Sequence, residues 1–419
     1  MLATLLSYWH LILSGLAPLL RPLLGLMAIL LLAMGMPQYL FNQEEFGNEP
    51  SQLAAMTSYC LVLLGGALFL RTLLAWGRET LLLAIPISLY FFIGFWSAIF
   101  NDIEAKDIVM ALLPYAGYGT FPATLALINS HRRLHLILKT VLFGCCLGCF
   151  GALVEYLLGI GVAYRGYIQV RSSVGQIGAL LGIIAWVASV LAFRHRLPFS
   201  RLLLVLLSFL FLGTWLVTLN KTIMIVTPLA VVTLVFLLST ELAISGLIKG
   251  VVFFLVVGLT LLSVNSDFFG QGALGSIREI DWIVDEGRRD EFELLTSENI
   301  WSLLFGHGFG ASWFSRSLQR EFFSCHNFFI QVFWQTGLVG SAVLLSFTTI
   351  YVSNFRKIAR RSELSKNSII LRSIAVSFLL GLVFMSAFQN RFTILHHTPL
   401  IGFILALPLL SPRVTGGNV

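Results

Sequence analysis

The stretch NFFIQVFWQTGLVGSAVLLSFTTIY, residues 327–351, contains no Asp, Glu, Lys or Arg. An uncharged run of this length is what a helix needs to cross about 30 Å of hydrocarbon. The whole chain of 419 residues is 57% hydrophobic and 11% charged, whereas soluble domains carry roughly 25% charged residues. The sequence therefore predicts an all-α, polytopic integral membrane protein, because a transmembrane β-barrel would show short segments of alternating hydrophobicity instead.

Apolar runs of similar length recur along the chain, and we expect about 12 transmembrane helices in a single domain, 1–419. The expected spans are 22–41, 53–76, 80–100, 107–129, 136–160, 174–193, 202–219, 222–240, 247–264, 327–351, 371–388 and 394–411. Residues 1–20 lack the basic start and the cleavage site of a signal peptide, so they either lie at the interface or join the first span.

The basic residues predict the orientation, because loops that stay in the cytoplasm are rich in Lys and Arg. With the N-terminus inside, the cytoplasmic loops carry Arg71, Arg78, HRRLHLILK, FRHRLPFSR, Lys249, NFRKIARRSELSK and Arg413. The first two loops on the outer side, NQEEFGNEP and NDIEAKD, are acidic. We therefore expect both termini in the cytoplasm.

The longest hydrophilic stretch, residues 265–325, is expected to form an outer loop between the ninth and tenth spans. Within it, RRDEFELLTSENIWSLLFG (288–306) has an approximate apolar stripe and predicts an amphipathic helix that lies along the membrane interface or caps the bundle. The run GHGFGAS should end this helix. A nucleotide-binding fingerprint is not expected there, since no strand precedes the glycines and no GK[ST] follows.

Basic side chains also occur on the outer side, where the positive-inside rule does not require them. They are Arg165, Arg171, Lys221, Arg288, Arg289 and Arg391. Each alone can be an anchor that snorkels to the lipid headgroups. As a set near one membrane surface, together with His326 at the mouth of the tenth span, they favour a site for a phosphate or diphosphate. The carboxylates of DWIVDEGRRD are expected to be solvated or paired with the neighbouring arginines.

His326-Asn327 opens the tenth span, and Gly337 and Gly340 follow on the same helical face as His326. The glycines would let a neighbouring helix approach closely, so this face is expected to pack against the bundle with the histidine at its outer end. Alternatively, His326 is a polar residue that merely tolerates the interface.

The order of EGRRDEF, an amphipathic helix, FGHGFG and HNFFIQVFWQTGLVG resembles the O-antigen ligase and O-antigen polymerase superfamily of bacterial membrane glycosyltransferases. The residues that match are Gly287-Arg288 with Phe292, then Gly306, Gly308 and Gly310, then His326-Asn327, then Gly337 and Gly340. The likeness extends in layout over about 165–400 and in motif over about 287–340. One departure is Lys221 in LNKTIMIV, where the family usually has an arginine, because lysine lacks the bidentate fork.

The resemblance implies a donor glycan linked to undecaprenyl diphosphate and a reaction at the periplasmic face of the bacterial inner membrane. In that reading His326 is the base or orients the acceptor hydroxyl. Arg288, Lys221 and Arg171 would bind the diphosphate, and Arg289 competes with Arg288 because adjacent helical side chains cannot both face the site. Arg165, Arg391 and His307 are second choices. No metal, cofactor or nucleic acid is expected.

The acceptor stays open between two possibilities. A repeat-unit polymerase would use another glycan, and a ligase would use the lipid A core; Lys221 favours the polymerase slightly. A lipid or glycan transporter is a further alternative. It predicts ionisable residues near mid-membrane and repeated halves, and the sequence shows neither.

Overall fold

The computed structural model describes residues 78–159, 162–164, 167–169, 173–192, 201–218, 221–239, 286–296, 299–317, 319–361, 365–388, 390, 392, 397–410 and 414–415. The predicted spans at 22–41, 53–76 and 247–264 lie outside these residues, as do residues 1–20.

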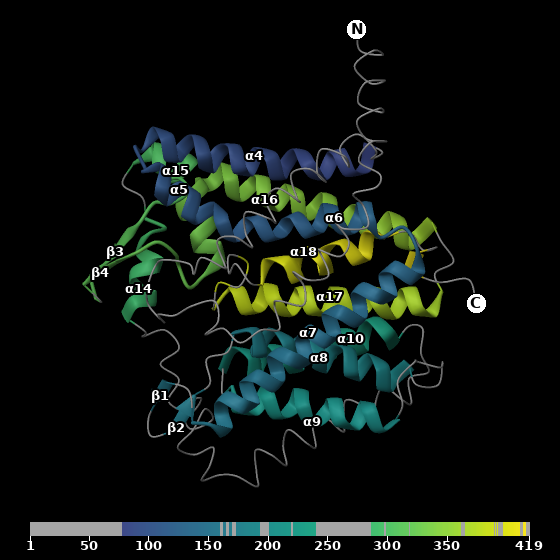
Figure 1. Ribbon diagram of the computed structural model, residues 1–419. Helices are drawn as coiled ribbons and strands as arrows, with labels where there is room; N and C mark the ends of the chain where they lie inside the picture. Colours follow the sequence, from purple (N-terminus) through teal and green to yellow (C-terminus); the bar gives the residue numbers. More distant parts are fainter. Residues whose placement is uncertain are drawn as a thin grey trace.

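The described residues are mainly helical (Figure 1). The helices are α4 (Arg78–Phe100), α5 (Ala105–Leu112), η3 (Leu113–Gly119), α6 (Thr120–Leu127), α7 (His131–Leu157), α8 (Ser173–Ala192), α9 (Arg201–Val217), α10 (Lys221–Ser239), α14 (Glu286–Glu293), α15 (Ile300–Phe305), α16 (Phe328–Arg361), α17 (Lys366–Ser386), α18 (Thr398–Ala406) and η5 (Leu407–Leu409). Two short antiparallel hairpins join β1 (Val162–Tyr164) to β2 (Tyr167–Gln169) and β3 (Trp313–Ser315) to β4 (Arg320–Phe322). These hairpins were not predicted.

Among the described residues, 5 segments are long and apolar enough to cross a membrane. They are Leu83–Phe100, Ala105–Leu125, His131–Leu157, Phe328–Ile358 and Asn367–Ser386. Shorter apolar helices cover Gly175–Leu191, Val205–Val217, Val226–Leu238 and Thr398–Leu409. The chain is thus a helical membrane protein. The full number of spans stays a prediction.

The predicted span at 107–129 is not one continuous helix, because η3 separates α5 from α6. The η3 turn contains Pro114 and packs tightly on α18: Thr398 Oγ1 donates to the Pro114 carbonyl at 2.6 Å. A Cβ on Gly117 would lie 2.0 Å from Thr398 Oγ1. The change of helix type therefore follows from a proline and from a contact that only glycine allows.

The helices pack as a bundle in which α4 and α16 lie side by side, α7 to α10 form the opposite part, and α17 and α18 lie between (Figure 1). The largest buried cluster joins α6, α7, α8, α9, α10, α17 and α18. A second cluster joins α4, α5 and α16 through Phe309, which is fully buried.

The bundle has two chemically different ends. At the basic end, the starts of α7 and α17 meet the C-terminal segment: His131 Nδ1 lies 3.2 Å from the Val414 carbonyl and Ser368 accepts from Thr415 Oγ1 at 2.7 Å. The exposed Arg356, on the last turns of α16, belongs to this end because α16 ends at Arg361 and α17 begins at Lys366, only a few residues later in the chain. The opposite end, called the site end, holds α14, the β3–β4 hairpin and the start of α16 (Figure 1).

Residues 306–310, called the glycine loop, insert between α4 and α16. Gly306, Gly308 and Gly310 all have positive φ. A Cβ on Gly308 would lie 2.2 Å from the Cα and N of Ala98 in α4, and one on Gly306 would lie 2.4 Å from the Thr336 nitrogen in α16. The glycines are therefore required for close packing of backbone on backbone.

The glycine loop also forms hydrogen bonds with backbone carbonyls of α16 that a kink leaves without a helical partner. Gly337 has φ 63 and ψ −163, so the helix is kinked there and the hydrogen bonds across it are interrupted. The amides of His307 and Gly308 donate to the carbonyls of Trp334 at 2.8 Å and Gln335 at 2.9 Å. Backbone acceptors freed by the kink are thus paired, as burial demands.

The predicted amphipathic helix at 288–306 is not continuous. α14 ends at Glu293 and α15 begins at Ile300. Thr296 Oγ1 donates to the Glu293 carbonyl at 2.6 Å, and the Asn299 side chain accepts from the Trp301 amide at 2.9 Å to cap α15. Short polar side chains that bind the backbone compete with helix in this way. Gly306 ends α15, as the sequence predicted.

Candidate functional site

The site end brings together segments that are far apart in the sequence. His326 and Asn327 precede α16, and Glu291 comes from α14, 35 residues earlier in the chain. Asn327 Nδ2 donates to the carbonyl of Ala387, just after α17, at 2.9 Å. Asn327 Oδ1 accepts from the Phe329 amide at 2.8 Å, so the same side chain caps α16 and ties it to α17.

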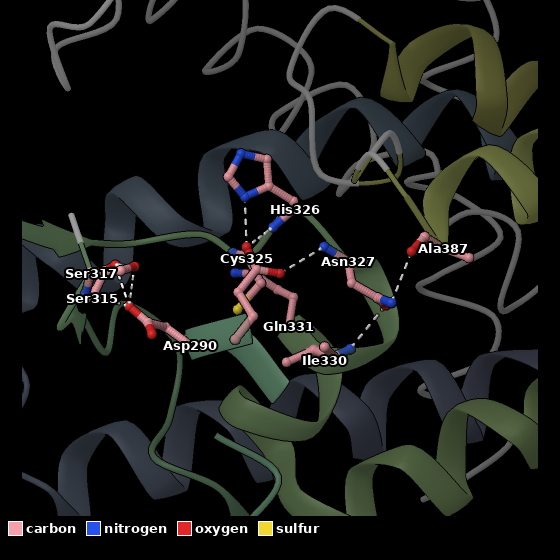
Figure 2. Close-up of polar contacts among 10 residues, drawn as sticks. Asp290, Ser315, Ser317, Cys325, His326, Asn327, Ile330, Gln331 and Ala387 are labelled. Atoms are coloured by element: carbon pink, nitrogen blue, oxygen red, sulfur yellow. Dashed lines mark hydrogen bonds and ion pairs between the residues drawn. The ribbon is translucent and has the colours of Figure 1, made fainter. Parts of the chain in front are cut away.

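His326 is held by the carboxylate of Glu291. Glu291 Oε1 lies 2.6 Å from His326 Nδ1 and accepts from the His326 amide at 2.7 Å, while Oε2 accepts from the Asn327 amide at 3.2 Å. The Glu291 side chain is 1% exposed and that of His326 is 49% exposed. Figure 2 shows the imidazole standing out from the chain above Cys325, beside Asn327. A buried carboxylate therefore orients an accessible ring.

This arrangement determines which nitrogen of His326 can do chemistry. A carboxylate accepts hydrogen bonds only, so in the neutral imidazole it fixes the proton on Nδ1. Nε2 then carries the free lone pair. The pairing is the one in which a carboxylate orients a histidine that acts as a general base. The group is suited to taking a proton from a hydroxyl that lies against the exposed side of the ring.

Residues next to the Glu291–His326 pair hold the backbone at His326 in place. The Cys325 amide donates to Gln331 Oε1, and Gln331 is 4% exposed. Burial, with the Glu291 carboxylate nearby, raises the pKa of the Cys325 thiol. The thiol stays protonated at neutral pH and serves as packing rather than as a nucleophile.

Asp290, next to Glu291 in α14, holds the β3–β4 hairpin. Its Oδ2 accepts from Ser315 Oγ at 2.6 Å, from the Ser317 amide at 2.9 Å and from Ser317 Oγ at 2.7 Å (Figure 2). These hydrogen bonds lower the pKa of Asp290 to about 2. The sequence predicted that the carboxylates of DWIVDEGRRD are solvated or paired with arginines. For Asp290 this prediction missed the contacts with Ser315 and Ser317, because they form only when the later β3–β4 hairpin has folded.

We expect the Asp290 contacts to resist mild acid. Because its pKa is depressed by folding, Asp290 contributes stability above its unfolded pKa of about 3.9. That contribution is lost as the pH falls through the folded value of about 2. Hydrogen exchange of the 313–322 amides, corrected for intrinsic pH effects, should show constant protection from neutral pH to about pH 4. Asp290→Asn should exchange faster in this segment at neutral pH, and Glu293→Gln should not. Equal exchange in Asp290→Asn and wild type would contradict the role.

The glycine loop is a packing element rather than a phosphate cradle. The amides of His307, Gly308 and Phe309 all donate to protein carbonyls, the last to Gly94 at 3.1 Å. The His307 ring stacks on Trp334 at 3.8 Å between centroids. Burial lowers the pKa of the His307 imidazole. It is therefore neutral at neutral pH and packs against α16.

The structure describes only some of the predicted anion-binding residues. The backbones of Arg288 and Arg289 lie in α14, beside Glu291. Lys221 is the first residue of α10. That helix starts at the site end, because Gly381 near the end of α17 approaches Val226 of α10: a Cβ there would lie 3.2 Å from Val226 Cγ1.

Arg165, Arg171 and Arg391 lie outside the described residues. His326, Lys221 and α14 therefore lie at the same end of the bundle, and the positions of the other three residues stay predictions. Among the described residues, no group of three or more His, Cys, Asp or Glu side chains is arranged to hold a metal ion.

Glu291 was not predicted from the sequence. It follows Arg288 by three residues, so helical spacing places both positions on neighbouring parts of one helix surface. A glutamate in a charged segment has many ordinary explanations, and only the contact with His326 distinguishes it. Comparison with protein-family models and with curated proteins finds no match for this chain.

Proposed function

We propose that this protein is a bacterial inner-membrane glycosyltransferase that moves a glycan from undecaprenyl diphosphate to an acceptor hydroxyl at the periplasmic face. The observation that carries the proposal is the Glu291–His326 pair, with Nδ1 of the imidazole 2.6 Å from a buried carboxylate and the ring half exposed. The motif order of the O-antigen ligase and polymerase superfamily supports the same assignment.

The chemistry assigned to His326 is removal of the acceptor proton. As the acceptor oxygen bonds to the anomeric carbon, its proton passes to Nε2 of His326, and Glu291 stabilises the imidazolium that forms. The bond between the anomeric carbon and the diphosphate oxygen breaks, and undecaprenyl diphosphate leaves with the electron pair. General base catalysis of this kind contributes about 10²–10⁴-fold to a rate.

Cationic side chains are assigned to the leaving diphosphate, whose negative charge grows in the transition state. Arg288 is preferred to Arg289, because position 288 is one helical turn before Glu291 while position 289 is nearly opposite on the helix. Lys221 is a second ligand, supported by the start of α10 at the site end. Arg171, Arg165 and Arg391 remain proposed ligands from the motif order and the predicted topology.

The proposed orientation has the site end in the periplasm. The basic end carries the exposed Arg356 and Lys357 on α16 and the exposed Arg132 on α7, and the positive-inside rule assigns such segments to the cytoplasm. With about 12 spans, both termini lie in the cytoplasm and residues 265–325 form the periplasmic loop. The acceptor is proposed to be a second repeat unit, as in a polymerase, since Lys221 replaces the arginine expected of ligases.

The test uses a strain deleted for the gene and complemented with wild type, His326→Ala or His135→Ala. Surface glycans and lipid-linked intermediates are then compared. His135 is a matched control because it is an imidazole on α7 near the basic end. The His326→Ala strain should show the deletion phenotype, and the His135→Ala strain should match wild type.

The intermediates identify the acceptor. Single repeat units on the lipid carrier, with no long chains, would mean a polymerase. Long chains held on undecaprenyl diphosphate, with a bare lipid A core, would mean a ligase. Normal glycans in the deletion strain, without a second copy of the gene, would remove both assignments and favour transport. Wild-type glycans with His326→Ala would refute the role of the histidine.

A further inference from the structure

Helix α15 carries large apolar side chains that the described part of the chain leaves exposed. Ile300 is 68% exposed and Trp301 is 59% exposed. The Trp301 ring stacks on Phe305 at 5.8 Å between centroids, so the two rings form one apolar surface. Exposed apolar surface of this kind, on a short helix outside the candidate spans, indicates that the helix contacts another molecule or a lipid bilayer. The level of α15 relative to the ends of α16 and α4 identifies this contact.

The first measure of position comes from α16. This helix has 34 residues and is kinked at Gly337, whereas the hydrocarbon needs about 20 residues of helix. One end of the span is marked by Arg356, which is exposed at the basic end. About 20 residues back along α16 lies Thr336. The loop that follows α15 binds α16 at this level, through the carbonyls of Trp334 and Gln335.

The second measure comes from α4 and is independent of the first. The apolar window of α4 ends at Phe100, and the exposed Asn101 and Asp102 follow. The hydrocarbon therefore ends near Phe100. Asn101 Nδ2 donates to the His307 carbonyl at 3.2 Å, and Ser97 Oγ donates to the Gly306 carbonyl at 2.7 Å. Both helices thus place the residues immediately after α15 at the edge of the hydrocarbon.

The exposed surface of α4 near this level is apolar as well. Phe92 is 60% exposed, Trp96 59% and Phe100 71%, and the Phe92 and Trp96 rings stack. Residues at this spacing lie on one face of a helix. Since α4 is a candidate membrane span, this face is turned to lipid acyl chains. α15 packs beside α4 (Figure 1), so its exposed residues continue an apolar surface that already requires lipid.

We propose that α15 is an interfacial anchor, whose Ile300 and Trp301 side chains enter the bilayer leaflet on the His326 side at the boundary between headgroups and hydrocarbon. The partner is the lipid bilayer itself. Tryptophan is enriched at this depth because its ring is apolar and its N–H is polar. The anchor holds the glycine loop, and through it the upper part of α16, at a fixed height. This inference is independent of the proposed reaction.

The level of His326 follows from a separate contact, and its consequence for the site rests on the proposed function. Asn327 Nδ2 donates to the carbonyl of Ala387 at 2.9 Å, and α17 ends one residue earlier, at the end of the candidate span Asn367–Ser386. His326 therefore lies near the level of the headgroups that border the hydrocarbon, where the diphosphate of a lipid-linked sugar is held.

The test places a photoreactive benzoylphenylalanine at Trp301 in the full-length protein, in nanodiscs of phosphatidylethanolamine and phosphatidylglycerol. Phe92 is the positive control and Ser317, in the hairpin turn, is the negative control. After irradiation, mass spectrometry identifies the cross-linked molecule and the carbon that was attacked. Position 301 should give lipid adducts at the glycerol and upper acyl carbons, position 92 adducts along the acyl chain, and position 317 none.

Two results at position 301 would overturn the proposal: no lipid adduct, or cross-links to another segment of this chain. If the Trp301 variant does not purify as a single species, the same probe at Ile300 answers the question, because that side chain is more exposed and one residue away. Neither result depends on glycan transfer, so failure of the anchor and failure of the proposed function are distinguishable.

Discussion

Replacing Glu291 with glutamine is expected to lower the rate of glycan transfer by about 100-fold or more. The carboxylate accepts from three donors, namely Nδ1 of His326 and the amides of His326 and Asn327. A glutamine has one acceptor and one donor group. In one orientation its NH₂ faces the Asn327 amide. In the other it faces the His326 amide and donates to Nδ1, which moves the ring proton to Nε2 and removes the base.

The measurement is the turnover of purified enzyme in lipid, with donor and acceptor varied separately. Because Glu291 does not itself touch the substrate in this mechanism, its loss should reduce kcat and leave KM for the donor nearly unchanged. A merely structural role would instead reduce the amount of folded protein. The fraction of active sites must therefore be determined by donor binding.

Two further variants sharpen the Glu291 experiment. Glu293→Gln removes an exposed carboxylate from the same helix and should behave as wild type. Glu291→Asp keeps the charge but shortens the side chain by one methylene, so it should retain more activity than the glutamine variant while remaining impaired. Wild-type kcat in folded Glu291→Gln would rule out the positioning role, even if His326 proved essential.

The second large effect is expected from Gly308→Ala. The new Cβ would lie 2.2 Å from the Cα and N of Ala98, and the residue would keep a φ of 98. Left-handed strain and overpacking together should reduce the free energy of unfolding by about 3 kcal/mol. The change should appear as a lower midpoint of denaturant unfolding in detergent and a lower yield of inserted protein.

A glycine elsewhere in the bundle supplies the control. A Cβ on Gly213, in α9, would meet only the Leu153 side chain at 3.6 Å. Gly213→Ala should be neutral, or stabilising by up to about 1 kcal/mol through helix propensity. Since the clash at Gly308 is with backbone atoms, adding Ala98→Gly should not rescue the Gly308→Ala variant. Wild-type stability in Gly308→Ala would mean that the loop does not pack between α4 and α16.

The sequence predicted the long apolar helices well, because their length and composition are determined locally. The expected span 174–193 corresponds to α8 at Ser173–Ala192, and 202–219 to α9 at Arg201–Val217. The break between α14 and α15 was missed, since the apolar periodicity continues through it. What interrupts the helix there is side-chain binding to the backbone by Thr296 and Asn299.

The candidate site was predicted only in part for the same reason. His326 is recognisable because an ionisable residue at the mouth of an apolar span is unusual. Glu291 lies in a segment rich in charge, and its significance arises from a contact across 35 residues of sequence. The predicted single face from His326 to Gly340 was wrong, because His326 precedes α16 and the helix is kinked at Gly337. Close approach at Gly337 does occur, and the approaching element is the end of α15, since a Cβ there would lie 2.4 Å from the Leu304 carbonyl.

The glycine loop also constrains the order in which the protein assembles. Ser97 in α4 and Gly306 in the loop are 209 residues apart in the chain, yet their contact completes the packing of α4 against α16. During synthesis α4 enters the membrane long before its partner exists, so its docking is a late, non-local event. Non-local closure of this kind is slow. Assembly of the site end is therefore expected to be post-translational, with α4 held in lipid until the last third of the chain is made.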